Sequence, residues 1–391
     1  MSKFIKSVSL AILFLFPVFF ITGCQDKNEI ESLGFIVAMG VDTDNNEDFK
    51  VSLQVIRKGA STERNQDAEV LVYVSTGKTI SGAVANISKQ MSKKIKFSNE
   101  KCIIVGQRLA ERGIQPVLDF SLRRSDIRPI VPILVTKGEA IDIVKTRTKQ
   151  NSISGYEIDN LVKIQRNLGV AAVSTSLDFE KNKRGRECSR ECVNTAGIIM
   201  KKTPRDTGSE NDLSISGSAV FKNCKLIGYM SEKETRGMNW IKGKVRRGTI
   251  TIQKDGDTIN TNILRAGSYI EAQEEKNEVV IHVKVTEKSN IDEVNKNSGE
   301  DMDFNSNPDL VDFLSENQNE AIYDEIISAL NVAKNTLGVD IFGFGNVVYE
   351  ECPKIWNHLK ENWNENFSKL RVDVNVDSNI TRTGILSKSI N

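Results

Sequence analysis

Apolar and polar positions in the first part of the chain follow the two-residue period of β-strands. Residues 34–42 form a nearly unbroken apolar run, which predicts a buried strand. Residues 49–57 alternate apolar with polar side chains, which predicts a strand buried on one face only. Because the Asp- and Asn-rich residues 43–48 favour a turn, the two strands are expected to form a hairpin, followed by a third strand at 70–74.

From residue 79 the apolar positions change to the spacing of an α-helix. They recur every three or four positions over 79–95, so they share one face of an amphipathic helix. Beyond it the pattern predicts strands at 101–106 and 130–136, and helices at 114–122, 138–145 and 156–168. The first half of the chain is therefore expected to be a mixed layer of strands and helices.

The second half continues with strands, which the pattern predicts at 213–221, 225–230, 245–252 and 279–285. Ser231 and Glu234 form an S-x-x-E capping box, so a helix is expected to begin there and to reach Ile241. The apolar spacing over 310–337 predicts the longest helix, and Gly338 is placed to end it. The chain then closes with a helix that begins near Pro353 and a strand at 371–377.

Two polar stretches indicate where the chain divides. Residues 287–308 are rich in Asn, Asp, Glu, Lys and Ser and are expected to form a loop or a partly disordered insert. Residues 201–212 combine proline, glycine, serine and aspartate and are the best candidate for a domain boundary. The expected organisation is a signal peptide at 1–23, an N-terminal mixed α/β domain at 24–200, a linker at 201–212, and a C-terminal α+β domain at 213–391, with a further split near 255 as an alternative. The expected fold class is multi-domain α+β, with two or three mixed sheets and amphipathic helices packed on them.

The N-terminus has the pattern of a secretory signal. Lys3 and Lys6 precede an apolar stretch over 8–21, which is short for a membrane-spanning helix of about 20 apolar residues. The stretch ends in Ile21-Thr22-Gly23-Cys24, which resembles a bacterial lipobox, with Ile21 where Leu is usual. The alternative is an ordinary signal peptide in which Cys24 lies there by chance. Because two acyl chains suffice for stable anchoring, a lipid on Cys24 would tie the chain to the outer face of a membrane.

Composition and charge exclude other classes of protein. The 53 basic and 52 acidic side chains nearly cancel, whereas proteins that bind nucleic acid carry a clear basic excess. Of six cysteines, five remain once Cys24 is modified, and an odd number argues against a disulfide-built scaffold. Cys102 and Cys224 lie among apolar residues and are expected in the core.

No motif for a cofactor, a metal or catalysis is complete. Residues 75–79 (STGKT) lie between a strand and a helix as in a P-loop, but the first glycine of that motif is missing. Cys188 and Cys192 have the spacing of two metal ligands, whereas a structural zinc site needs four. Only His282 and His358 could serve a Ser-His-Asp or Cys-His site. We therefore expect no enzyme activity, no catalytic residues and no bound cofactor or metal.

Three stretches together resemble a known family. The first is 23–31 (GCQDKNEIE), with Gln25 where family members commonly have Trp. The second is 217–240, which contains GSAVFK, KLIG and ETRG and ends at Trp240. The third is 340–345 (DIFGFG), followed by Pro353, Trp356 and Trp363. In this order and after a lipobox, they resemble the Ger(x)C family of spore germination lipoproteins, the C component of nutrient germinant receptors.

The resemblance implies a non-catalytic lipoprotein subunit, anchored through Cys24 to the inner membrane of a bacterial spore. Its partners would be a multi-pass A subunit and a permease-like B subunit, and the complex would respond to small nutrients such as amino acids. The resemblance assigns neither catalytic residues nor contact with the nutrient to this subunit, and it implies a multi-domain α+β fold.

One candidate partner interface and two other functions remain open at this point. Arg236, Met238 and Trp240 are a candidate interface, because apolar side chains lie among basic ones over 236–247. The alternative is that Trp240, like Trp356, is buried in the core. A solute-binding lipoprotein of a transporter is a second function, although such proteins usually have two similar lobes. An exported cell-wall hydrolase is a third, and it would require a pocket with paired buried carboxylates.

Overall fold

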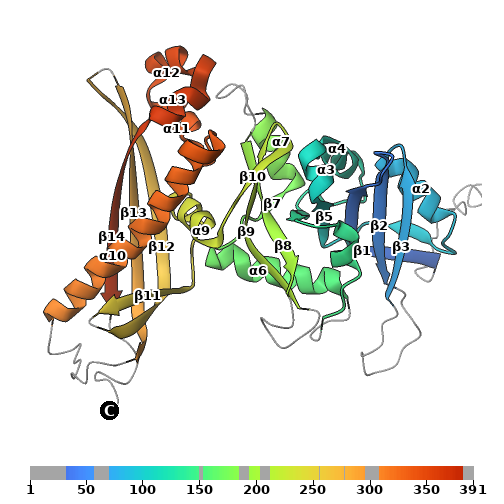
Figure 1. Ribbon diagram of the computed structural model, residues 1–391, viewed down its shortest axis with the longest axis horizontal. Helices are drawn as coiled ribbons and strands as arrows, with labels where there is room; N and C mark the ends of the chain where they lie inside the picture. Colours follow the sequence, from blue (N-terminus) through green and yellow to red (C-terminus); the bar gives the residue numbers. More distant parts are fainter. Residues whose placement is uncertain are drawn as a thin grey trace, which may run out of the picture.

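The computed structural model describes residues 32–56, 70–148, 153–184, 193–202, 212–254, 256–276, 278–295 and 308–381. These residues form two mixed β-sheets with helices packed on them, which confirms the predicted α+β class. The molecule is elongated, with one sheet and its helices at each end of the long axis (Figure 1). The predicted signal peptide and Cys24 lie outside the described residues.

The first sheet has the strand order β10-β9-β8-β6-β5-β1-β2-β3. Its strands are β1 (Leu33–Thr43), β2 (Phe49–Ile56), β3 (Val70–Gly77), β5 (Cys102–Gly106), β6 (Pro132–Thr136), β8 (Val193–Lys201), β9 (Leu213–Lys222) and β10 (Lys225–Met230). β1, β5, β6 and β8 are parallel in the middle, and antiparallel pairs flank them on both sides. The short strands β4 (Lys94–Lys96) and β7 (Ser174–Thr175) pair with β1 and β6.

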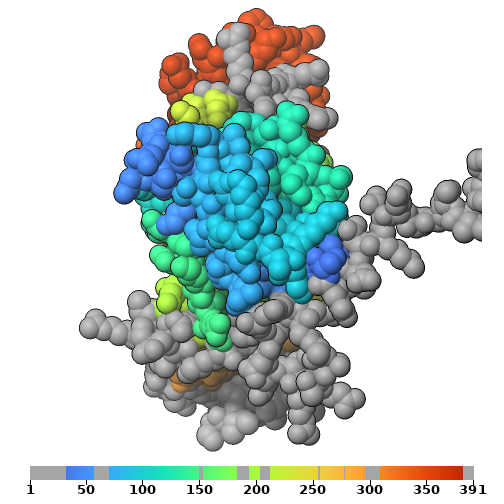
Figure 2. All heavy atoms as spheres, turned by 90° about the vertical axis from the view of Figure 1, so that its right-hand side faces the viewer, coloured from blue at the N-terminus to red at the C-terminus, as the bar shows by residue number. Residues whose placement is uncertain are grey.

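Helices cover both faces of this sheet. On one face lie α2 (Ile80–Ser88), α3 (Gln107–Arg112), α4 (Gln115–Arg123) and α7 (Ser176–Arg184), which share one apolar core with the strands. On the other face lie α5 (Ala140–Val144) and α6 (Ser154–Leu168), which enclose a second core. Figure 2 views the molecule from the end at which the first sheet lies. The first third of the chain covers the centre of this view, and α11–α13 project above it.

Because helices cover both faces, β2 is buried on both sides, and the prediction of a half-buried strand was wrong. Its polar Gln54 is 1% exposed. The Gln54 side-chain amide donates to the Val144 carbonyl and the Ser154 hydroxyl at 3.0 Å, and its oxygen accepts from Gly155 N–H at 3.0 Å. These bonds satisfy the buried amide, so a polar residue is tolerated where the alternation had indicated solvent.

The second sheet has the order β11-β12-β13-β14. Its strands are β11 (Thr249–Lys254), β12 (Asp257–Glu275), β13 (Glu278–Asn295) and β14 (Arg371–Thr381). The long helix α10 (Pro308–Asn331) lies along this sheet and continues as the π-helical turn η3 (Val332–Leu337) (Figure 1). Gly338 ends it with φ 61°, as predicted. At one end of the sheet lie α11 (Phe344–Glu351), α12 (Pro353–Leu359), the 3-10 turn η4 (Lys360–Asn362) and α13 (Trp363–Lys369).

Some predicted element bounds were wrong. The helix predicted over 79–95 ends at Ser88, and Met91 and Ile95 reach the same core from a non-helical segment. Residues 287–295, predicted as a loop, continue β13, and β12 was not predicted along its length. In β13 buried residues such as Val285, Ser289 and Ile291 alternate with exposed polar ones. Because the outer face of β13 is polar, the alternation typical of a strand was not recognised in the sequence.

The predicted domain boundary at 201–212 remains a prediction about folding units. The strands that flank it, β8 and β9, are antiparallel neighbours in the first sheet. The change from the first to the second sheet comes later, through α9 (Glu232–Ile241). The predicted capping box at the start of α9 is confirmed, because the Ser231 hydroxyl accepts from Glu234 N–H and the Glu234 carboxylate accepts from Ser231 N–H.

α9 meets α10 at a position where no side chain fits. A β-carbon added to Gly237 would overlap the Glu325 carbonyl oxygen and lie 3.0 Å from the Ala329 Cβ. The backbones of the two helices therefore approach each other at a glycine, which joins the end of the first sheet to the helix that covers the second.

A buried polar network fixes α10 on the second sheet. Glu287 on β13 is 4% exposed, and its carboxylate accepts from the side-chain amide of Gln318 on α10. The Gln318 side chain also donates to the Ser289 hydroxyl at 2.9 Å and accepts from the Thr261 hydroxyl at 2.6 Å. Burial raises the pKa of Glu287 to about 7, above the ordinary value of 4.5, although hydrogen bonds from Gln318, Ser289 and Ser378 to its carboxyl group oppose the shift.

We predict that Gly237→Ala destabilises the chain by about 2 kcal/mol, because overpacking against the α10 backbone exceeds the gain in helix propensity. Urea unfolding measures the difference. Gly138→Ala is the control, since a β-carbon at this exposed glycine would meet no atom within 4 Å. Equal stability of both variants would contradict the close approach of α9 to α10.

A second prediction concerns Glu287→Gln and pH. The pKa of Glu287 is about 7 in the folded chain, whereas the ordinary value is 4.5. Between pH 4.5 and 7 the folded chain therefore keeps a proton on Glu287 that the unfolded chain releases. The stability contributed by the protonated carboxyl is therefore present below about pH 4.5 and lost as pH rises to 7. The neutral variant keeps that stability, so at pH 8 we expect it to be about 2 kcal/mol more stable than the parent chain.

Urea unfolding of both proteins between pH 4.5 and 8 tests this prediction. Glu278→Gln, on the exposed start of the same strand, is the control and should follow the parent chain at every pH. A constant difference between Glu287→Gln and the parent across the range would show that the carboxyl does not titrate there.

Candidate functional site between the two sheets

A polar cavity of about 430 Å³ lies where the two halves of the molecule meet. One wall comes from β7, α7 and β8, and the other from residues 242–244 after α9, the loop at 340–346 and the start of α13. A second cavity of about 510 Å³ adjoins it and shares Asp178, Lys181 and Lys244 with it. Both volumes lie in the range of small-molecule sites.

The loop at 340–345 is built around one carboxylate. Oδ1 of Asp340 accepts from Phe342 N–H at 3.0 Å and Gly343 N–H at 2.8 Å. Oδ2 accepts from Gly345 N–H at 2.8 Å and from the Trp363 indole N–H at 3.2 Å. Since Gly343 and Gly345 lie at the start of α11, Asp340 satisfies backbone groups that the helix itself cannot pair.

Two tryptophans close the back of this loop. The Trp356 and Trp363 rings have centroids 5.0 Å apart in an edge-on arrangement. A β-carbon on Gly345 would lie 3.0 Å from Trp363 and 3.3 Å from Trp356, so the absence of a side chain lets both rings pack there. Trp356 is 1% exposed, which confirms its predicted position in the core.

Lysine side chains give the cavity its electrostatic character. Lys242 is partly buried, and Lys181 and Lys244 are exposed at the edge. Burial lowers the pKa of Lys242 to about 7, and the charge of Lys244 acts in the same direction, whereas Asp340 opposes them. Burial in the cavity wall thus makes the charged form of this ammonium group less favourable.

The predicted interface residues Arg236, Met238 and Trp240 do not form a surface patch. Met238 and Trp240 are each 1% exposed and belong to the core of the second half. The Trp240 indole donates to the Glu325 carboxylate at 2.8 Å, and Arg236 lies 3.3 Å from the same carboxylate. The spacing that suggested exposed apolar side chains instead places one face of α9 against α10.

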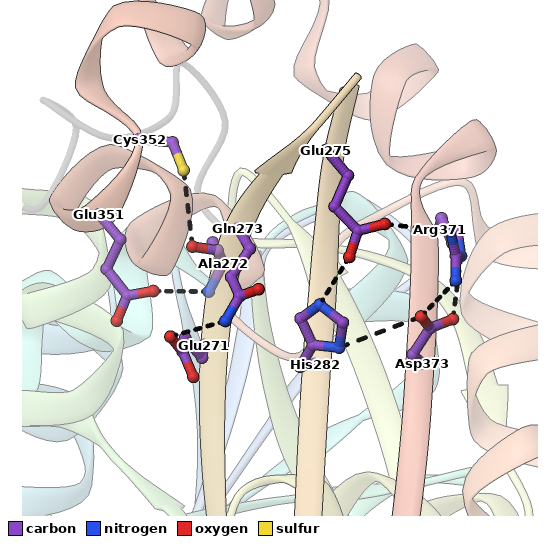
Figure 3. A network of polar contacts seen from close by, with 9 residues as sticks. All are labelled: Glu271, Ala272, Gln273, Glu275, His282, Glu351, Cys352, Arg371 and Asp373. Carbon is purple, nitrogen blue, oxygen red and sulfur yellow. Dashed lines mark hydrogen bonds and ion pairs between the residues drawn. The ribbon is translucent and has the colours of Figure 1, made fainter. Parts of the chain in front are cut away.

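His282 lies on the outer face of the second sheet, in an acidic setting (Figure 3). Its Nε2 is 3.3 Å from Glu275 and its Nδ1 is 4.0 Å from Asp373, while Arg371 bridges both acids. The Cys352 thiol does not contact His282, and it donates to the Ala272 carbonyl at 3.5 Å. The neighbouring Glu351 carboxylate accepts from Ala272 N–H (Figure 3). Among the described residues, no hydroxyl or thiol is hydrogen-bonded to His282, so this group has the contacts of a surface ion-pair network.

The remaining sequence candidates have structural positions or lie outside the described part. His358 is exposed on α12, and its Nδ1 is 3.1 Å from the Lys354 carbonyl. Cys102 and Cys224 are buried, as predicted. In the STGKT stretch, the Thr79 hydroxyl accepts from Gly82 N–H and caps α2. Cys188 and Cys192 lie outside the described residues.

None of the described helices is long and apolar enough to span a membrane.

Two family descriptions match almost the whole chain beyond its N-terminus. Residues 26–187 match "Spore germination protein N-terminal domain", and residues 216–384 match "Spore germination B3/ GerAC like, C-terminal". The chain belongs to the Ger(x)C family of spore germination proteins. The interval between the two matches includes the predicted boundary at 201–212, whereas the first sheet continues across it.

Similar Ger(x)C proteins align with this chain from end to end. Spore germination protein KC of Bacillus subtilis (strain 168) is 24% identical over 99% of this chain and 98% of its own length. Spore germination protein B3 of the same organism is 22% identical over 98% of this chain and 100% of its own length. The crystal structure of the GerBC protein has a TM-score of 0.55 at 16% identity, covering 90% of this chain and 99% of that one. This likeness shows a shared fold.

The sequence had identified only part of the cavity. The DIFGFG stretch carried the family resemblance, and the basic residues after α9 belonged to the proposed patch at 236–247. The wall from α7 and β8 was missed, because Asp178, Lys181 and Asn194 are distant from both stretches in sequence. Nothing local in their segments indicates that they face a cavity.

We predict that Asp340→Ala lowers the free energy of unfolding by about 3 kcal/mol, because it leaves four partly buried N–H donors without a charged acceptor. Asp312→Ala, at an exposed position of α10, is the control and should change stability by less than about 0.5 kcal/mol. Urea unfolding followed by tryptophan fluorescence measures both, since Trp363 is one of the donors. A small effect of Asp340→Ala would mean that the loop holds its shape without the carboxylate.

Proposed function

We propose that this chain is the C subunit of a nutrient germinant receptor and acts as a lipoprotein on the outer face of the spore inner membrane. The supporting observation is the match to Ger(x)C descriptions over 26–187 and 216–384, directly after the lipobox-like Ile21-Thr22-Gly23-Cys24. A lipid on Cys24 would hold a water-facing body beside membrane-embedded partners.

The proposed role is assembly with a multi-pass A subunit and a permease-like B subunit, without catalysis by this chain. Its motif residues support that role, because they serve packing. Gly237 allows two helices to meet, Asp340 builds a loop, and Gly345 makes room for two tryptophans. Neither His282 nor His358 has a nucleophile as a hydrogen-bond partner within the described ranges.

Cys24→Ala tests anchoring and assembly together. In spores of the native host we expect the variant to leave the membrane fraction, and the multi-pass partners to be lost from its affinity purification. Germination in response to nutrients should fall accordingly. Cys352→Ala changes a partly buried thiol outside the lipobox and should leave all three readouts unchanged.

Mass spectrometry of the purified protein gives the decisive measurement. It should find a diacylglyceryl group on an N-terminal Cys24. An unmodified residue 24 in a chain that is still membrane-bound would contradict the lipid anchor. Normal partner recovery with the Cys24→Ala protein would contradict a role of anchoring in assembly.

Binding of a small solute is a second function, favoured by the cavity between the two halves. The two sheets have different strand orders, so they lack the likeness usual for the two lobes of a transporter-type binding protein. We therefore treat solute binding as an addition to the receptor role, and not as a replacement for it.

A further inference from the structure

Three lysines from different segments line the cavity between the two sheets. Lys242 follows α9, Lys244 lies two residues further on, and Lys181 extends from α7 on the opposite wall. Within the described part of the chain, no ion pair or hydrogen bond is formed by any of their ammonium groups. An unpaired ammonium in a partly enclosed site favours a negatively charged partner.

The acidic side chains of the same cavity are largely occupied. All four hydrogen bonds of the Asp340 carboxylate go to N–H groups of its own loop and of Trp363. Oδ2 of Asp178 accepts from the backbone N–H and the hydroxyl of Thr175 at 2.9 and 2.8 Å. These bonds leave the lysines as the main charged groups available to a ligand.

The rest of the lining suits a small polar molecule. Asn194 and Thr195 on β8 and Asn346 near the start of α11 supply amide and hydroxyl groups. The adjoining cavity adds Arg166 and Arg246, so the positive character continues beyond the first cavity. A site with convergent polar groups and several cations fits a compact organic anion.

We propose that this cavity binds a small organic anion through a carboxylate or phosphate group that contacts Lys242, with Lys244 and Lys181 completing the charge pairing. The ligand touches both halves of the molecule, since Lys181 belongs to the helices of the first sheet and the loop at 340–346 to the second half. The inference rests on the solute binding proposed above and names the class of solute, whereas it is independent of the proposed receptor role.

Calorimetric titration of the purified full-length protein in detergent tests the site, with succinate and inorganic phosphate as probes at constant ionic strength. Saturable binding of either probe in the millimolar range or tighter is expected, and the two probes distinguish a carboxylate from a phosphate site. Sodium chloride at the same ionic strength controls for screening of surface charge. No saturable heat with either probe up to 50 mM would overturn the proposal.

Lys242→Gln keeps most of the side-chain length and removes the charge, so we expect it to weaken binding at least tenfold. Lys181→Gln, on the exposed opposite wall, should weaken binding several-fold and does not disturb a buried position. Lys233→Gln is the matched control, because it removes the same charge from the exposed face of α9 outside both cavities. Equal weakening by all three variants would indicate general charge attraction and contradict the site.

The pH dependence of binding gives an independent readout. The groups that face Lys242 are Lys244 on its own loop, Asp340 before α11, and Asp178 and Lys181 on α7. Since the anion prefers the charged ammonium and the pKa of Lys242 is about 7, binding of succinate should weaken about tenfold between pH 6 and 8. This dependence should disappear in Lys242→Gln, and its persistence there would exclude Lys242 as the contact.

Discussion

The contact between Gly237 of α9 and the backbone of α10 at Glu325 determines how the two halves of the molecule are joined. No side chain fits at this contact, so the helices meet backbone to backbone. α9 is fixed to the first half as well, because the Thr235 hydroxyl lies 2.9 Å from that of Ser218 on β9, and the Asn239 amide donates to the Gly169 carbonyl at 2.6 Å. One short helix therefore contacts both halves, and the position of Lys242 directly after it follows from that placement.

The acidic partner at this joint is the partly buried carboxylate of Glu325, and its energetics are not simply favourable. Burial raises the pKa of Glu325, while Arg236 and the Trp240 indole oppose the shift. Taking a charge out of water costs free energy that a single ion pair regains only with good geometry and further hydrogen bonds. Glu325 accepts a hydrogen bond from the Trp240 indole at 2.8 Å and lies 3.3 Å from Arg236 Nε, which forms no hydrogen bond among the described residues. Because an apolar contact would tolerate several rotations of α9, we attribute to this polar triad the single orientation of the helix on α10.

The sequence predicted those features that depend on neighbours along the chain, and it failed where distant segments decide. The capping box at Ser231, the helix end at Gly338 and most strands follow from local spacing, so they could be recognised. The burial of Gln54 could not, because α5 and α6 cover a face of β2 that the alternation had assigned to solvent. The patch at Arg236, Met238 and Trp240 failed for the same reason. Its spacing is that of an amphipathic helix, and only the position of α10 determines that the apolar face is covered.

The cavity has one part that depends on neighbours along the chain and another that depends on distant segments. Its Asp340 loop is local, with backbone partners no more than five residues away, and belongs to a stretch that carries the family resemblance. Its lysines come from α7 and from the segment after α9, so their proximity depends on the contacts of α9 with the first half. A ligand can shift a conformational equilibrium only by its difference in affinity between two arrangements. The proposed anion contacts Lys181 on one half and lies against the Asp340 loop on the other. If the two halves moved relative to each other, these contacts would change, and the affinity for the anion would differ between the two arrangements. Occupancy of the cavity would therefore stabilise the joint at α9.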